Sequence, residues 1–131
     1  MKSVRITKRQ KNLIEKGATA LATSDLDNRP NVIVVACCKV VDRDKILITD
    51  NFMNKTRSNL LKNNRVAIAV WSKDWKEGYQ FKGKVQYFTS GKWKRIVDED
   101  PDNKELAHKA AVLVKVDEIW DLAEPKLIIK R

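Results

Sequence analysis

Residues 30–41 read PNVIVVACCKVV and are continuously apolar from Val32 to Cys38. A strand with one face in water alternates apolar and polar residues, whereas a continuous apolar run is typical of a strand covered on both faces. The segment therefore predicts one long strand from Pro30 to Val41, buried on both sides as in a closed barrel. Just before it, Asp25 to Asn28 predicts a hairpin turn, because Asp and Asn tolerate the backbone angles that such turns require.

Strands are also expected on either side of this segment, because β-branched and aromatic residues alternate there with small or polar ones. They span residues 18–23, 45–49, 65–71, 79–89 and 111–120. Gly83, in the middle of its strand, predicts a bulge or a close approach of another backbone. After Pro125 only a basic tail is expected. Six mostly antiparallel strands predict a mainly β (α+β) fold, a closed or nearly closed barrel with short helices at its rim.

Four helical segments are expected, over residues 7–16, 55–63, 90–97 and 103–109. Thr7 and Ser90 are candidate N-caps, and Gly17 is a candidate left-handed stop for the first helix. In the second helix, Leu60 and Leu61 are expected to face inward.

The chain has 131 residues and a net charge of +10, from 27 basic and 17 acidic side chains. This length fits a single domain over residues 1–131, and the charge favours anionic partners such as phosphate cofactors. No apolar run approaches the roughly 20 residues of a membrane span, and the N-terminus lacks the apolar stretch of a secretory signal. We therefore expect a cytoplasmic protein without a membrane partner.

Few residues offer catalytic chemistry. The chain has a single histidine, His108, and its two cysteines, Cys37 and Cys38, lie inside the apolar run. These residues cannot form a zinc-type ligand set, so no metal site is expected. The two thiols are interpreted as buried core groups, with redox or metal chemistry as the alternative. The acidic cluster Asp98-Glu99-Asp100 is interpreted as a solvated helix end, with metal binding as the alternative. No dinucleotide or P-loop motif occurs.

Residues 50–57, DNFMNKTR, carry the strongest local signal for a binding site. They follow a predicted strand and open a predicted helix, where free backbone N–H groups attract anions. Lys55, Thr56 and Arg57 add an ammonium, a hydroxyl and a guanidinium, a set that suits a phosphate monoester. The alternative is structural: Asn54 is then an ordinary N-cap, and the basic side chains behind it are merely solvated.

Six segments resemble, in order and at natural spacing, the short single-domain members of the pyridoxamine 5'-phosphate oxidase-like family of FMN-binding split barrels. They are LATS (21–24), NRPNVIV (28–34), DNFMNKT (50–56), NLLKNNRVA (59–67), GYQFKG (78–83) and AVLVKVDEIW (111–120). The resemblance spans roughly residues 3–121. It implies a six-stranded split barrel, a homodimer, and one FMN in each subunit at the dimer interface.

The resemblance also implies eight cofactor-binding residues. Lys55 and Thr56 look like phosphate ligands. Val34, Val35 and Ala36 look like the strand segment along the flavin, and Asn51, Phe52 and Met53 look like the loop bordering its rings. The fuller oxidases carry an arginine at the position of Asn54, and Arg57 is a candidate to replace it.

Other departures from the family bear on activity. The fuller oxidases have a C-terminal extension whose Arg and His grip the vitamin phosphate, and no such pair follows Glu124 here. Pyridoxine phosphate oxidation is therefore not expected. A flavin-dependent reductase, an electron carrier and a flavin-binding protein without turnover stay open, as does a deazaflavin in place of FMN. The four tryptophans are interpreted as core or interface residues, with stacking on a partner subunit's flavin as the alternative.

A second class of function is a small basic β-barrel that binds nucleic acid. Tyr79, Phe81, Tyr87 and Phe88 would then stack bases on an exposed strand. Because the same strand must also face a core, we expect flavin binding rather than nucleic-acid binding.

Overall fold

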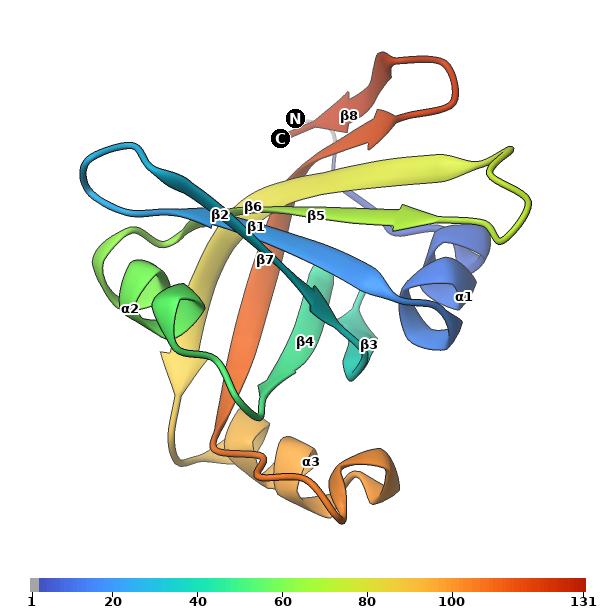
Figure 1. Cartoon of the computed structure of the whole chain (residues 1–131). Helices are drawn as coiled ribbons and strands as arrows, with labels where there is room; N and C mark the ends of the chain where they lie inside the picture. The colour runs from blue at the N-terminus through green and yellow to red at the C-terminus, as the bar shows by residue number, and fades with distance from the viewer. Residues whose placement is uncertain (1–2) are drawn as a thin grey trace.

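The computed structural model describes residues 3–131, which form eight β-strands, three α-helices and one short 3-10 helix (Figure 1). The helices are α1 (Lys8–Lys16), α2 (Lys55–Lys62) and α3 (Lys92–Glu99), and the 3-10 helix is η1 (Pro101–Asn103). The strands are β1 (Thr19–Ser24), β2 (Pro30–Val35), β3 (Cys38–Asp42), β4 (Lys45–Asp50), β5 (Arg65–Trp71), β6 (Gly78–Phe88), β7 (Ala110–Asp121) and β8 (Lys126–Lys130). Within residues 3–131, no helix has the length and apolar character needed to cross a membrane.

The strands form one antiparallel sheet in the order β2-β1-β5-β6-β7-β4-β3, with β8 paired to β7. The two end strands, β2 and β3, follow one another in the chain and are joined through Ala36 and Cys37. Over the described residues they form no ladder with each other. The sheet therefore curls until its two edge strands, β2 and β3, come together at the short segment of chain that joins them. The barrel is not closed by hydrogen bonds between these two strands. This is a split barrel, as expected, but it has more strands than the six predicted.

The core fills the inside of the curled sheet. Ile48, Ile68 and Phe81 are fully buried there and come from three different strands. The β6–β7 register shifts between Lys82 and Gly83, and a Cβ at Gly83 would lie 2.1 Å from the carbonyl oxygen of Lys115. The bulge and the close backbone approach predicted at this glycine are both confirmed.

The segment that predicted a barrel strand is two strands, not one. β2 ends at Val35, and β3 begins at Cys38. Val32 and Val34 are 65% and 68% exposed, so the expected burial on both faces is wrong. The reason is topological: β2 is an edge strand that pairs only with β1, and its outward-facing valines have no neighbouring layer over them. An apolar strip is thus left on the outside of the barrel.

The predictions for the ends and the buried faces of α1 and α2 are confirmed only in part. Thr7 caps α1 in a reciprocal capping box with Gln10, as predicted. Gly17 adopts an extended conformation instead of the predicted left-handed stop. In α2, Leu60 faces inward as expected, but Leu61 is 63% exposed. The buried face of this short helix consists of Thr56, Asn59 and Leu60, and Leu61 lies about 100° round from Leu60.

The C-terminal third departs most from the prediction. α3 follows Gly91, which has φ 88, and Ser90 is not its cap. The helix expected over residues 103–109 is absent from the described chain, where only η1 forms. The basic tail after Pro125 is strand β8, which pairs with the end of β7. Its five residues fold as a strand because β7 offers them a free edge, which a local pattern does not reveal.

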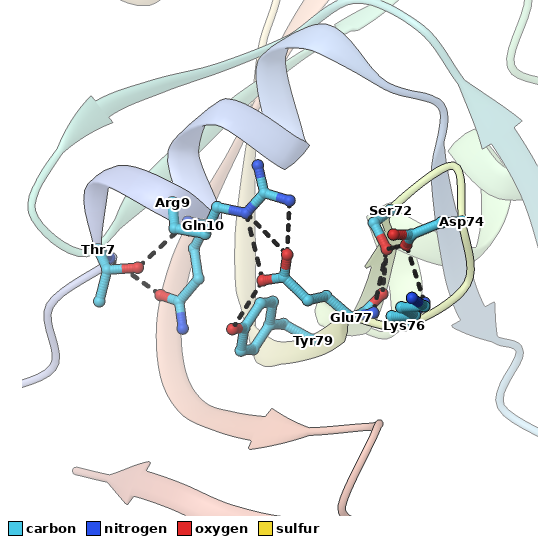
Figure 2. Close-up of polar contacts among 8 residues, drawn as sticks. All are labelled: Thr7, Arg9, Gln10, Ser72, Asp74, Lys76, Glu77 and Tyr79. Carbon is cyan, nitrogen blue, oxygen red and sulfur yellow. Dashed lines mark hydrogen bonds and ion pairs between the residues drawn. The ribbon is translucent and has the colours of Figure 1, made fainter.

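The β5–β6 hairpin ends in a loop that hydrogen bonds hold in place (Figure 2). Asp74 Oδ1 accepts the Ser72 hydroxyl at 2.6 Å and the Lys76 N–H at 3.0 Å, while Ser72 Oγ accepts the Glu77 N–H at 3.0 Å. The carboxylate of Glu77 then accepts the Arg9 Nε–H at 3.0 Å, which ties the loop to α1. The loop is therefore a fixed part of the barrel.

This loop displays an exposed tryptophan. Trp75 has φ 65 and is 78% exposed, and its ring stacks on Trp71 with 6.1 Å between centroids. Trp75 is thus not a core residue of the isolated chain, which leaves the interface interpretation of this residue open.

Candidate functional site

One cavity of about 430 Å³ opens where β2, the loop after β4 and the start of α2 meet. All eight predicted site residues lie on its wall: Val34, Val35, Ala36, Asn51, Phe52, Met53, Lys55 and Thr56. Two segments that are distant in sequence meet there because α2 lies against β1 and β2. The structure therefore gathers the predicted residues into one site, whose ligand stays a prediction.

The loop after β4 is built around one buried carboxylate. Asp50 is fully buried, and its Oδ1 accepts the N–H of Met53 at 2.9 Å. Its Oδ2 accepts the Nε–H of Arg57 at 3.0 Å and the hydroxyl of Tyr87 at 2.5 Å. Burial, together with this carboxylate, raises the pKa of Tyr87 to about 12, so its hydroxyl stays a proton donor. These contacts fix the backbone of residues 51–53 on the cavity wall.

Arg57 does not lie on the wall, contrary to its interpretation as a phosphate ligand. Its Nε–H binds Asp50, and its Nη2 donates to the carbonyl oxygen of Met53 at 2.8 Å. The hydrogen bond to Asp50 raises the pKa of the guanidinium further. A residue two positions after Lys55 lies about 200° round the helix, which turns it away from the cavity. Arg57 neutralises Asp50 instead.

The start of α2 offers free donors to the cavity. Asn54 occupies the N-cap position of α2, as the structural alternative expected, but over residues 3–131 its side chain makes no capping hydrogen bond. The first-turn N–H groups therefore lack a side-chain cap and carry the positive end of the helix dipole. Lys55 lies beside them, and Thr56 Oγ1 accepts Asn31 Nδ2–H at 3.1 Å, which leaves the Thr56 proton free to donate. Amides, an ammonium and a hydroxyl together fit a phosphate.

The rest of the wall is mostly apolar. Ile33, Val34, Val35 and Leu106 line it, and Phe52 stands at its edge with 76% of its surface exposed. Small-molecule and cofactor sites are commonly cavities of this size, lined mostly by apolar side chains with a few polar groups. The site thus has an apolar chamber with polar and cationic groups at one end, an arrangement that fits an amphipathic cofactor of the flavin type.

The sequence missed six wall residues: Asn31, Ile33, Cys37, Thr49, Asn54 and Leu106. Five of them lie within three residues of a predicted one, so extending the two predicted segments finds them. Leu106 is different, because it comes from the chain after η1. The His108 N–H donates to Asn51 Oδ1 at 2.8 Å and brings that distant segment to the cavity, which no sequence signal foretold.

Comparison with known proteins places the chain in a family. Residues 6–123 match the family model described as pyridoxamine 5'-phosphate oxidase. The chain belongs to the pyridoxamine 5'-phosphate oxidase family. The chain is also similar to an uncharacterized protein of Methanocaldococcus jannaschii, to which it is 38% identical over 127 residues. That match covers 91% of this chain and 82% of the relative.

Solved structures share the barrel of this pyridoxamine 5'-phosphate oxidase family member. HupZ of Group A Streptococcus superposes with a TM-score of 0.88 at 23% identity, covering 95% of this chain and 99% of HupZ. An FMN-binding protein from Syntrophomonas wolfei superposes with a TM-score of 0.74 at 19% identity, covering 88% of this chain and 85% of that one. At these identities the likeness shows the fold alone.

The two thiols of this family member differ in position. Cys38 is buried, and burial raises its pKa to about 12. Cys37 is half-buried on the cavity wall, where burial and then the charges of Asp100 and Asp102 raise its pKa. Both thiols are therefore protonated at neutral pH, so neither is an activated nucleophile. The interpretation as buried core thiols holds for Cys38 but not for Cys37.

The acidic end of α3 is paired rather than merely solvated. Asp98 binds the Lys94 ammonium, and its Oδ1 lies 2.7 Å from His108 Nδ1. The hydrogen bond from Lys94, followed by that from His108, lowers the pKa of Asp98. Among residues 3–131, no group of three or more His, Cys, Asp or Glu side chains is placed to hold a metal ion.

The aromatic residues of the nucleic-acid alternative do not form an exposed platform. Phe81 is fully buried, while Tyr79 and Tyr87 pack against the main core. Phe88 packs against a second cluster under α3. Core packing in this chain therefore uses the side chains that base stacking would need.

Proposed function

We propose that this protein binds FMN in the cavity beside α2 and transfers electrons or a hydride through it. The observation that carries the proposal is the cavity, an apolar chamber with Lys55, Thr56 and an uncapped helix start at one end. Membership of the pyridoxamine 5'-phosphate oxidase family supports a flavin. The Syntrophomonas wolfei protein of the same fold, which binds FMN, supports it further.

Each predicted residue has a task in this proposal. Lys55, the Thr56 hydroxyl and the first-turn amides of α2 hold the phosphate. The strand segment 34–36 and the loop 51–53 border the rings, and the buried Asp50 keeps that loop in position. A bound flavin supplies the redox chemistry, while the chain binds it, orients it and shields it from water.

The wall also limits the reactions that the chain itself can assist. Among the described residues that line the cavity, the ionisable side chains are Lys55 and Cys37. Lys55 is needed for the cofactor phosphate, and the Cys37 thiol stays protonated because its pKa is raised. We therefore propose an oxidoreductase or electron-transfer protein in which the substrate or solvent, and not a side chain of the cavity wall, supplies or accepts any proton. We do not assign oxidation of a vitamin phosphate, because the wall offers no second cation for it.

We further propose that the active form is a homodimer. Val32, Val34 and Phe52 expose large apolar surfaces on β2 and at the cavity edge. Exposed apolar groups that lie together mark interaction sites in soluble proteins. A second copy over this strip would remove the valines from water and cover the open side of the flavin cavity.

Visible absorbance of the purified protein and titration with FMN test the proposal. We expect a bound flavin that is released as FMN on denaturation, and a dimer in sedimentation at micromolar concentration. A colourless protein that takes up no FMN, but retards an oligonucleotide in a salt-dependent manner, would refute flavin binding and favour the nucleic-acid alternative. A monomer that still holds FMN would refute only the dimer.

A further inference from the structure

A row of basic side chains crosses the outer face of the barrel. Arg65 on β5 pairs in register with Lys84 on β6, and Lys84 pairs in register with Lys115 on β7. Residues that stand opposite one another in a ladder point to the same face of the sheet, and all three of these residues are exposed. Since neighbouring strands lie about 4.8 Å apart, the three positions form a line of about 10 Å. We call them the basic row.

The cations of the basic row have no carboxylate partners. Over residues 3–131, no member of the row takes part in an ion pair. Lys45 on β4 stands opposite Lys115 but differs from it, because Asp42 and Asp44 lie 3.3 and 3.2 Å from the Lys45 ammonium. The row therefore consists of three unpaired cations and ends at a lysine whose charge is compensated.

Two carboxylates lie near the row, at the β6–β7 bulge. Two members of the row line a hollow of about 280 Å³ together with Lys82, Asp117 and Glu118. Lys82 stands opposite Glu118 in the ladder, and Asp117 Oδ1 lies 3.6 Å from Arg131 Nη1. These carboxylates thus have cations of their own beside them, and the positive charge of the basic row remains.

The fold gains nothing from this arrangement of charges. Like charges that stand directly opposite each other on neighbouring strands destabilise a sheet, and Lys84 stands between two other cations. An exposed strand position accepts uncharged residues equally well, as Gln86 two positions further along β6 illustrates. Folding therefore does not explain the basic row, whereas a ligand that carries negative charges in a line does.

The surroundings of the row favour one class of polyanion. The exposed large apolar side chains of the described chain include none from residues 63–67, 82–86 or 113–117. Membrane-surface segments insert apolar groups beside their basic ones, and protein–protein interfaces have an apolar centre. Interfaces with nucleic acid are instead polar and strongly positive, and the phosphates of one strand form a line of negative charges.

We propose that the basic row binds the phosphate backbone of a nucleic acid and neutralises about three of its phosphates. This mode of binding does not need the aromatic residues, which are packed into the cores. Phosphate contacts carry no base information, so binding is independent of sequence. No member of the row lines the cavity proposed for FMN, so this inference goes beyond the proposed function and does not depend on it.

Fluorescence anisotropy with a short labelled oligonucleotide, as a single strand and as a duplex, tests the proposal at several salt concentrations. Three phosphate contacts predict a slope of about −2 to −3 for the logarithm of the binding constant against the logarithm of the salt concentration. Binding should therefore weaken about 20- to 40-fold between about 50 and 200 mM salt, and it should do so equally for unrelated base sequences.

Lys84→Gln removes the central cation, and Lys11→Gln, at an exposed lysine of α1, is the control of equal charge change. Lys84→Gln should weaken the oligonucleotide about three- to tenfold at low salt and reduce the slope by about 1. Its Tm should equal or exceed that of wild type, because two like-charge contacts are relieved, and its affinity for FMN should be unchanged. Lys11→Gln should leave oligonucleotide binding nearly unchanged.

Three results would overturn the proposal. Wild type that does not bind the oligonucleotide would do so, as would Lys84→Gln that binds it like wild type. Equal weakening by Lys11→Gln would show that net charge, and not the basic row, attracts the nucleic acid. Vesicles that contain an anionic lipid complete the test: if wild type binds them more tightly than the oligonucleotide, and Lys84→Gln loses this binding, the row is a membrane contact and the proposal is wrong.

Discussion

Replacing Lys55 by alanine should weaken FMN binding and leave the fold intact. The side chain is exposed on the cavity wall, beside the uncapped first turn of α2. A hydrogen bond to a charged group contributes about 1.5–3 kcal/mol, and exposure to water favours the lower value. Since about 1.4 kcal/mol corresponds to a factor of ten, we expect FMN to bind roughly tenfold more weakly.

The effect on the protein without cofactor should have the opposite sign. A cation in the first turn of a helix is repelled by the positive end of the helix dipole, by about 0.3–1 kcal/mol. Lys55 is in no ion pair within residues 3–131 that would offset this repulsion. The Tm of the apo protein should therefore stay unchanged or rise slightly in Lys55→Ala.

Flavin fluorescence titrations of wild type, Lys55→Ala and a Lys11→Ala control, each with FMN and with riboflavin, measure the effect. Riboflavin lacks the phosphate, so its weaker binding should not respond to Lys55→Ala. The Lys11 control removes the same charge from α1, which lies on the other side of the barrel from α2 (Figure 1). Equal FMN affinity in wild type and Lys55→Ala would remove Lys55 from the site. A large drop in apo Tm would show instead that the lysine is part of the scaffold.

Four further predictions follow from the same structure. Asp50→Asn should lower the free energy of unfolding by about 1–3 kcal/mol in urea denaturation, because a neutral amide with one acceptor oxygen replaces a buried carboxylate that accepts three hydrogen bonds; an unchanged midpoint would show that these bonds do not stabilise the fold. Gly83→Ala should lower it by about 1–3 kcal/mol, since its Cβ would meet the Lys115 carbonyl at 2.1 Å; a wild-type midpoint would contradict that close approach. Cys37→Ser should leave the rate of flavin reduction by NAD(P)H or dithionite nearly unchanged, because the raised pKa keeps the thiol protonated; lost turnover with flavin bound would reveal a redox thiol. Burial acts to raise the pKa of Asp44, but hydrogen bonds from Arg131 and Lys45 outweigh it and lower that pKa below its unfolded value of about 3.8. The stability from Asp44 is therefore fully present above about pH 3.8 and is lost as the pH falls from there through the lower folded pKa. The Tm of wild type should fall more between about pH 4 and 2 than that of Arg131→Ala, and parallel curves would refute this.

The sequence by itself determined the elements that short-range chemistry controls. Thr7 caps α1 because the capping residue and its partner, Gln10, lie within one turn of each other. Gly83 marks the bulge because a glycine inside a strand of large residues signals a close backbone approach. The resemblance to a known family named eight candidate site residues, and all eight line one cavity. Their binding of a flavin is still to be tested.

Only the tertiary structure decided which partners each element meets. The run from Pro30 to Val41 is equally apolar whether it is buried or at an edge, and the sheet order made β2 an edge strand. β8 forms because β7 has a free edge, and Leu106 reaches the cavity through the bond between His108 and Asn51. Arg57 faces Asp50 rather than a phosphate because the helix turns it toward a carboxylate that the fold has buried. Such outcomes depend on contacts between residues far apart in the chain, and no local pattern records them.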